Sequence, residues 1–162
     1  MLIACKKQVV LLELLLLAIS KLYIQKQEKC MTAEIYWLTL NVVLTAFMVI
    51  PYAIYRTGKL GGLWQVFKTP LPGDSPFDDA WAHRAYRAHM NAFEGIALFA
   101  PVAIGVHVTG MGNEVTAIAA AVYFWARLIY APLYYFDVPV LKTTSWMVGL
   151  MATLTLAFQL LI

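Results

Sequence analysis

Four long apolar blocks constrain the fold of this 162-residue chain more than any other feature. A helix needs about 20 residues to cross a hydrocarbon layer ~30 Å thick, and blocks of that length lie at about 35–55, 88–108, 115–136 and 144–162. The composition agrees, because 62% of the residues are hydrophobic and only 13% are charged, too few to cover the surface of a soluble domain. We therefore predict an all-α, integral membrane four-helix bundle.

Several other classes of protein do not fit. A soluble four-helix bundle would carry a polar face on every helix, and the first and last blocks have none. The sequence contains no glycine-rich phosphate loop, HExxH zinc motif or GxSxG elbow, so the common soluble-enzyme signatures are missing. Cys5 and Cys30 have neither the spacing of metal ligands nor a disulfide framework. We predict neither a metal nor a nucleic-acid partner.

Residues 1–30 differ from the rest of the chain. Their apolar run is only about a dozen residues long and is interrupted by Glu13, which is short for a spanning helix. They contain five lysines and two glutamates, whereas residues 31–162 contain seven basic and seven acidic groups. Three interpretations stay open. Residues 1–30 are a disordered extension or the product of an upstream start codon, or they form an interfacial or signal-anchor helix, or they form a fifth span. We treat 1–30 as an N-terminal extension and 31–162 as the membrane domain.

The positive charges of the membrane domain predict its orientation. The loops around 56–87 and 137–143 contain Lys or Arg, and the 109–114 side has none. By the positive-inside rule, these two loops face the cytoplasm. In a bacterial cell the protein would lie in the inner (plasma) membrane.

A polar stripe runs along the start of the second block. At 100° per residue, four polar side chains share an arc of about 80° and extend about 15 Å along the helix, whereas His89 points to the other side. Burying unpaired charge costs several kcal/mol, so these groups need a partner or a ligand. The stripe consists of Arg84, Arg87, Asn91 and Glu94.

A second stripe lies on the third block, where Arg127 shares one face with Tyr123, Tyr130 and Tyr134. Each residue also has an ordinary interpretation, as a snorkelling arginine, a structural ion pair or an interfacial aromatic. Two one-sided polar faces in one bundle nevertheless favour a shared cleft. Arginines bind carboxylates and a glutamate accepts from an ammonium group. A small zwitterion with more than one carboxylate would suit this cleft, beside an apolar wall for a hydrophobic co-substrate.

The motif R-A-x-x-N-x-x-E at the head of the second span, here Arg87, Ala88, Asn91 and Glu94, resembles that of the membrane-associated proteins in eicosanoid and glutathione metabolism, the MAPEG family. The stretches "WAHRAYRAHMNAFEG" and "YFWARLIYAPLYYFDVPVLKTTSW" look most like its bacterial branch. The resemblance covers residues 35–162. It implies a homotrimer that binds glutathione between neighbouring subunits, near the cytoplasmic side. Carried over residue by residue, with Arg84 added from the same stripe, the glutathione-binding set is Arg56, Arg84, Arg87, Asn91, Glu94, Tyr130 and Tyr134.

The resemblance is weaker at the catalytic group. The family's chemistry needs a group that favours the thiolate, the nucleophilic form of the thiol, and the eicosanoid branch uses an arginine shortly after the span-three tyrosines. Here the nearest basic residue is Lys142, eight positions beyond Tyr134 and followed by Thr143, Thr144 and Ser145, and a lysine does not replace the planar fork of an arginine. We expect Lys142 or Arg127 to take this role.

The resemblance thus implies a glutathione-dependent transferase or peroxidase. It would act on hydrophobic electrophiles or lipid hydroperoxides that enter from the membrane lipid. The alternative is a non-catalytic member of the same family that binds lipid or a partner protein. A small transporter, or an unrelated bundle with polar faces, is the third possibility.

Overall fold

The computed structural model describes residues 31–69 and 77–162, and the elements found there are helices without strands. The open question about residues 1–30 lies outside these residues. Residues 33–162 form one unit. Its helices are α2 (Ala33–Phe47), α3 (Ile50–Leu60), α4 (Leu63–Lys68), α5 (Ala80–Thr109), α6 (Glu114–Tyr135) and α7 (Pro139–Gln159).

Four helical segments of the described residues are long and apolar enough to cross a membrane, which confirms the predicted four-span fold. One of them joins α2 and α3 into a single stretch from Ala33 to Leu60. The break between the two helices comes just before Pro51, at the start of α3, since proline lacks the N–H that would continue the ladder. Large apolar side chains such as Ile54, Val108 and Val140 are mostly exposed, as expected where lipid surrounds the protein. The chain is a multi-pass integral membrane protein.

The predicted span limits were wrong at two helix starts. The second span begins at Ala80 rather than at 88, and the fourth at Pro139 rather than at 144. The first span also continues past residue 55 to Leu60. Arg84 and Arg87 therefore belong to α5, and the loop predicted around 56–87 contains the short helix α4. Charged residues lower the hydropathy of a helix end without preventing it from forming, because Arg and Lys are good helix formers.

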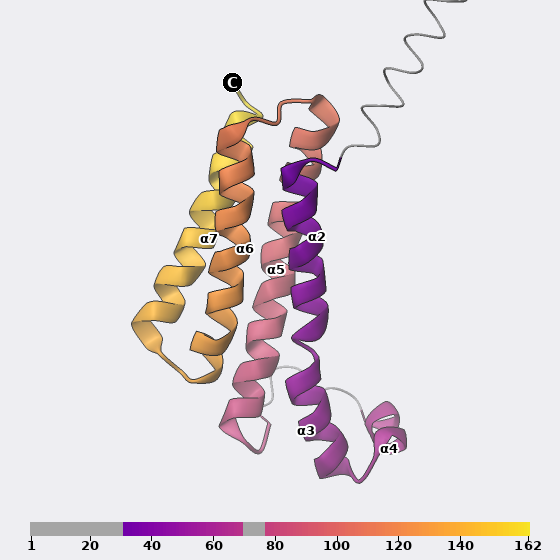
Figure 1. Ribbon diagram of the computed structural model, residues 1–162. Helices are drawn as coiled ribbons and strands as arrows, with labels where there is room; N and C mark the ends of the chain where they lie inside the picture. The colour runs from indigo at the N-terminus through magenta and orange to yellow at the C-terminus, as the bar shows by residue number, and fades with distance from the viewer. Residues whose placement is uncertain (1–30, 70–76) are drawn as a thin grey trace, which may run out of the picture. The chain divides into compact units, whose positions relative to one another are not determined.

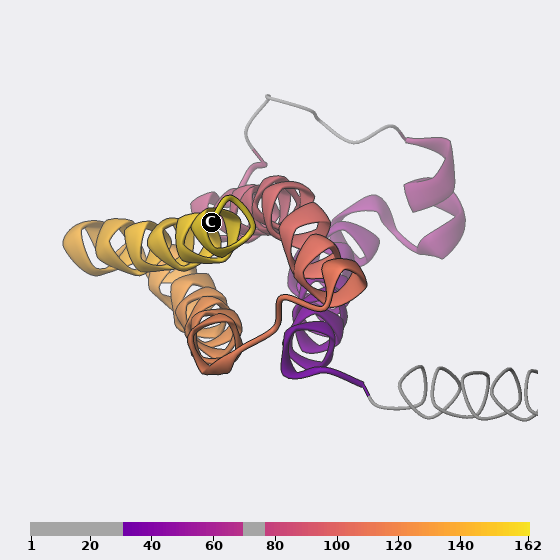
Figure 2. The ribbon, with the colours of Figure 1, turned by 90° about the horizontal axis from the view of Figure 1, so that it is seen from above.

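Two central helices hold the unit together. α5 and α6 pack against each other, and each also packs against α2 and α7, an arrangement visible along and across the helices (Figures 1 and 2). Small side chains allow the close approach: Ala103, Ala119, Ala120 and Ala152 are all buried, and small residues are typical of helix contacts in membranes.

Short turns at both ends fix the antiparallel order of the spans. Gly110 adopts φ +68° and ends α5, a left-handed conformation that favours glycine. Asn113 caps α6, because its side chain accepts from the N–H of Thr116 and the Thr116 side chain accepts from the N–H of Asn113. The turn at 136–138 returns the chain into α7. The end of α3, the start of α5, the end of α6 and the start of α7 consequently lie at one end of the unit (Figure 1).

Candidate functional site

The two predicted polar stripes meet between α5, α6 and α7. A cavity of about 190 Å³ opens there, which we call the outer cavity because it lies near the 136–138 turn. It receives side chains from all three helices, so that none of them builds it alone. Its lining residues are Asn91, Tyr130, Tyr134, Lys142, Thr143 and Trp146.

A second cavity, which we call the inner cavity, lies deeper along the same helices. Its volume is about 130 Å³, and it shares Asn91 and Trp146 with the outer cavity. Its other lining residues are Glu94, Gly95, Leu98, Arg127, Leu150 and Thr153. The inner cavity therefore combines polar side chains from α5, α6 and α7 with the apolar Leu98 and Leu150.

A hydrogen-bonded chain connects the two stripes. Nη1 of Arg127 donates to Oδ1 of Asn91 over 3.1 Å, and Nδ2 of Asn91 donates to Oε2 of Glu94 over 3.4 Å. Arg127 is only 7% exposed, and its guanidinium lies over the rings of Tyr123 and Tyr130 at 5.1 and 5.8 Å from their centroids. Asn91 is thereby held between a buried cation and a carboxylate, at the point where the cavities meet.

Lys142 supplies the positive charge of the outer cavity. Its Nζ donates to Oδ1 of Asp137 over 2.6 Å and lies 5.0 Å from the centroid of the Tyr134 ring. The hydrogen bond and the charge of Lys142 hold the pKa of the Asp137 carboxyl below its usual value. The carboxylate thus fixes the ammonium group against the tyrosine and partly neutralises it.

The other predicted glutathione ligands lie outside both linings. Arg84 donates through Nε to the carbonyl oxygen of Tyr135 over 2.9 Å. Arg87 is exposed on α5, one turn before Asn91. Arg56 is buried in α3 and donates to the carbonyl oxygen of Thr69 over 2.9 Å. The structure brings together Asn91, Glu94, Arg127, Tyr130, Tyr134 and Lys142.

His89 points away from both cavities, as the helical spacing predicts. Its Nδ1 lies 2.7 Å from the hydroxyl of Tyr52, within an aromatic group that includes Tyr86 and Phe93. This histidine is buried, and its hydrogen-bonded partner comes from α3. Its position is explained by helix packing.

The sequence analysis missed Trp146, which lines both cavities. Trp146 follows Lys142 by four residues and so lies on the same face of α7, but this signal depends on a helix that starts at Pro139. Of the three hydroxyl residues after Lys142, only Thr143 lines the outer cavity. Ser145 instead donates to the carbonyl oxygen of Ala126 over 2.6 Å and ties α7 to α6.

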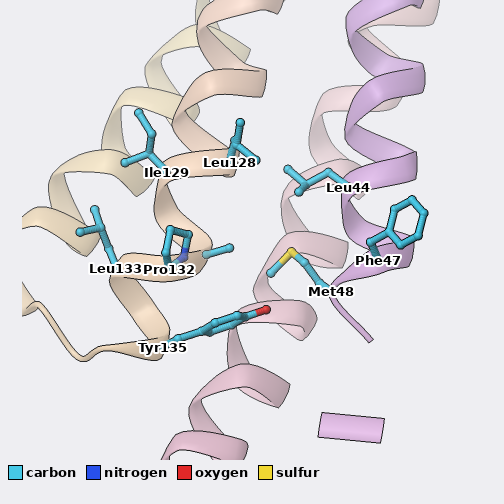
Figure 3. Close-up of a pocket in the computed structure, with 9 residues that line it drawn as sticks. Leu44, Phe47, Met48, Leu128, Ile129, Pro132, Leu133 and Tyr135 are labelled. Atoms are coloured by element: carbon cyan, nitrogen blue, oxygen red, sulfur yellow. The ribbon is translucent and has the colours of Figure 1, made fainter. Parts of the chain in front are cut away.

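A third hollow is a different feature. An apolar groove of about 550 Å³ lies between α2 and α6, lined by residues such as Leu44, Met48 and Leu128 (Figure 3). Tyr135 closes one end of it, and no charged side chain contributes to its lining. Apart from the Tyr135 phenol, this groove offers apolar contact. The polar cavities are therefore the candidate site.

Comparison with known proteins agrees with the motif in α5. The sequence model of the MAPEG family matches residues 35–162, which includes every residue that lines the two cavities. No curated protein matches the chain.

Proposed function

The chain belongs to the MAPEG family, and from this premise we propose that it is a membrane-bound, glutathione-dependent transferase or peroxidase. It joins the glutathione thiol to hydrophobic electrophiles from the bilayer, or reduces lipid hydroperoxides with it. The family is that of the membrane-associated proteins in eicosanoid and glutathione metabolism. The reaction itself is our proposal.

The outer cavity is the observation that carries this proposal. It combines an amide, two phenols, an ammonium and a threonine hydroxyl from three helices, with Glu94 immediately beyond it. A tripeptide with two carboxylates and one ammonium group needs donors and acceptors in this mixture. Tyr130 and Tyr134 lie with ring centroids 5.4 Å apart and present their hydroxyls from adjacent turns of α6. Glutathione bound here would place its thiol beside Trp146 and Lys142.

Activation of the thiol follows from local charge. A thiolate is favoured where cations lie nearby, which lowers the pKa of a thiol. Lys142 in the outer cavity and Arg127 in the inner cavity both face the space around Asn91 and Trp146. We assign these two cations to thiolate stabilisation. The thiolate then attacks an electrophile that arrives from the lipid side.

The remaining ligands point to a site completed by a neighbouring subunit. Arg87 and Glu94 are exposed on one protomer, whereas Arg56 packs in α3 and reaches the carbonyl oxygen of Thr69. Exposed charges on a membrane helix favour burial against another polar surface. We therefore propose a homotrimer in which the α5 stripe of one protomer packs against the next.

Calorimetric titration of glutathione into the detergent-purified protein tests the binding site. We expect saturable binding that Arg87→Ala weakens by about 2–5 kcal/mol, because a guanidinium paired with a carboxylate in a desolvated site contributes that much. Lys68→Ala is the matched control, since it also removes one positive charge but from the exposed helix α4. Equal affinities of the two variants would remove Arg87 from the site, and no binding by the wild type would contradict the proposed function.

One observation favours the alternative, a non-catalytic family member that binds lipid or a partner protein. Lys142 is already paired with Asp137, so part of its charge is unavailable to a thiolate. Turnover of glutathione with 1-chloro-2,4-dinitrobenzene separates the two functions. An enzyme shows saturable conjugation above the uncatalysed rate, whereas the non-catalytic alternative shows no conjugation above that rate.

A further inference from the structure

The short helix α4 presents an apolar face to its surroundings. Trp64 and Phe67 are 80% and 79% exposed, and Leu63 is 64% exposed. At 100° per residue these three side chains share an arc of about 100°, and the rings of Trp64 and Phe67 contact each other with centroids 6.5 Å apart. Single exposed apolar residues are common, but a contiguous group on one helix face marks an interaction site. We call this group the α4 face.

Contacts with α3 hold α4 in place. Gly62 adopts φ +128° between the two helices, a conformation that favours glycine, and its N–H donates to the carbonyl oxygen of Thr57 over 3.0 Å. After α4, the carbonyl oxygen of Thr69 accepts from Nη2 of the buried Arg56 over 2.9 Å. Val66, which lies outside the α4 face, is partly buried. Both ends of α4 are therefore tied to α3, and the α4 face is left exposed.

The membrane surface passes close to α4. The first span ends at Leu60 and is 28 residues long, about 42 Å at 1.5 Å per residue, which matches the ~40–45 Å thickness of a bilayer with its headgroups. α4 begins at Leu63, after a turn of two residues, beside the end of α3 (Figure 1). Trp81, in the first turn of the second span, is partly exposed and contacts the ring of Tyr55 in α3 over 5.5 Å. Tryptophans of this kind lie at the membrane interface, so α4 lies at the level of the headgroups.

Lysines flank the α4 face. Lys68 is exposed at the end of α4, and at 100° per residue it lies about 40° beyond Trp64. Lys59 is exposed on α3, where its Nζ lies 3.6 Å from Oδ2 of Asp79. An exposed ion pair of this length is weak, so Lys59 also contributes positive charge to this surface. An apolar face with a basic rim is complementary to a membrane surface that contains anionic phospholipids.

We propose that the α4 face inserts into the headgroup region of the bilayer that the protein spans, with Lys68 at the phosphates of anionic phospholipids. Leu63, Trp64 and Phe67 then contact the upper part of the acyl chains. This surface is separate from both polar cavities, whose linings contain no residue of α4, and it does not depend on the proposed glutathione chemistry. α4 thereby adds an interfacial anchor to the four spans.

Spin labels on two sides of α4 test the insertion. Each label is attached to a single cysteine in a Cys5→Ser, Cys30→Ser background, and the full chain is reconstituted into vesicles of phosphatidylcholine and phosphatidylglycerol. Oxygen concentrates in lipid, whereas the polar complex nickel ethylenediaminediacetate stays in water. For a helix inserted 5–10 Å deep, we expect the ratio of oxygen to nickel collisions at Phe67→Cys to be about tenfold that at Gln65→Cys, the matched control on the other side of the helix. A Phe67→Cys label that meets nickel as freely as the control lies in water, and one that meets neither reagent lies against protein. Either result would overturn the proposal.

Quenching by labelled lipids tests the role of Lys68. A bimane fluorophore at Leu63→Cys is exposed to phosphatidylglycerol or phosphatidylcholine that carries a doxyl quencher at the start of one acyl chain. We expect stronger quenching by phosphatidylglycerol, and we expect Lys68→Gln to reduce this preference about fivefold, the effect of one lysine at an anionic surface. Lys142→Gln is the matched control, because it removes a lysine that is paired with Asp137 outside α4, and it should leave the preference unchanged. Equal quenching by the two lipids, or a preference that survives Lys68→Gln, would overturn the anionic lipid contact.

Discussion

At the scale of single residues, adding one methyl group at Gly95 should destabilise the folded protein. Glycine to alanine in an exposed helix stabilises by about 0.5–1 kcal/mol. At position 95 the new methyl group would meet Arg127 and Tyr123 at under 3.0 Å, and overpacking of this kind destabilises by about 1–3 kcal/mol. We therefore expect Gly95→Ala to lower the thermal unfolding temperature in detergent.

Gly58→Ala is the matched control for this substitution. Gly58 lies inside α3, and a Cβ there would meet nothing within 4 Å. Its replacement should leave the unfolding temperature unchanged or raise it. A Gly95→Ala protein as stable as Gly58→Ala would show that Arg127 and Tyr123 move aside freely, contrary to a tightly packed contact at Gly95.

Asp137 gives the site a pH dependence. Its folded-state pKa is lowered, first by the hydrogen bond from Lys142 and then by the charge of Lys142. Such a group stabilises the folded state above the unfolded pKa of about 3.9, and the contribution is lost as pH falls through the lower folded value. The wild type should therefore unfold at a higher temperature than Asp137→Asn near pH 6, and the difference should shrink below about pH 4. A difference independent of pH would contradict this ion pair.

Residue spacing predicted one part of the site and could not predict another. The 100° periodicity places Asn91 and Glu94 on one face of α5 and His89 on the opposite face, and the contacts with Arg127 and Tyr52 agree. The surroundings of Tyr123 depend on what α5 places opposite it, at Gly95 and Phe99. Such cross-helix distances follow from packing, which a one-dimensional pattern does not contain.

At the scale of helices, a buried polar contact joins α2 to α6 at the end opposite the cavities. Glu34 is 2% exposed and accepts a hydrogen bond from the fully buried Thr116 hydroxyl. Thr116 lies in the first turn of α6, where the helix dipole also favours a negative charge. Thr116→Val should lower the free energy of unfolding by about 1–3 kcal/mol, because it leaves the Glu34 carboxylate without its donor and the Asn113 N–H without its acceptor.

Thr39→Val controls for the loss of a threonine hydroxyl. Thr39 is exposed on α2, and its hydroxyl donates to the carbonyl oxygen of Ile35 in its own helix. This variant should change the unfolding free energy by less than about 0.5 kcal/mol. Equal effects at the two positions, measured by denaturant unfolding in the same detergent, would show that the contact between α2 and α6 adds nothing.

The existence of the helices was predictable, and their ends were less so. Apolar length alone identifies four spans, but α5 continues for eight residues before the predicted start at 88, through Arg84 and Arg87. Hydropathy measures the free energy of transfer into lipid. A helix can continue beyond the lipid into the headgroup region, where arginine side chains are well solvated and arginine is still a good helix former. For the same reason the first turn of α7 was not predicted, and so the shared helix face of Lys142 and Trp146 was missed.

At the scale of the whole molecule, orientation decides whether the outer cavity can meet its substrate. The described helix ends that surround this cavity carry Arg84 and Lys142, and the opposite turn at 110–113 has no lysine or arginine. Positive charge is retained on the cytoplasmic side, and glutathione is a cytosolic thiol. We expect the turns at 61–62 and 136–138 to face the cytoplasm and the turn at 110–113 to face outward.

Cysteine labelling in intact cells tests this orientation. In a Cys5→Ser, Cys30→Ser background, a membrane-impermeant maleimide should label Met111→Cys at once, since Met111 lies in the outward turn and is partly exposed. Lys59→Cys, near the end of α3, should react only after the membrane is permeabilised. The reverse pattern would place the outer cavity away from the cytosolic glutathione pool. Labelling after permeabilisation measures how much of each variant is expressed. When labelling of intact cells is divided by this value, differences in expression cancel, and an inverted orientation is still seen.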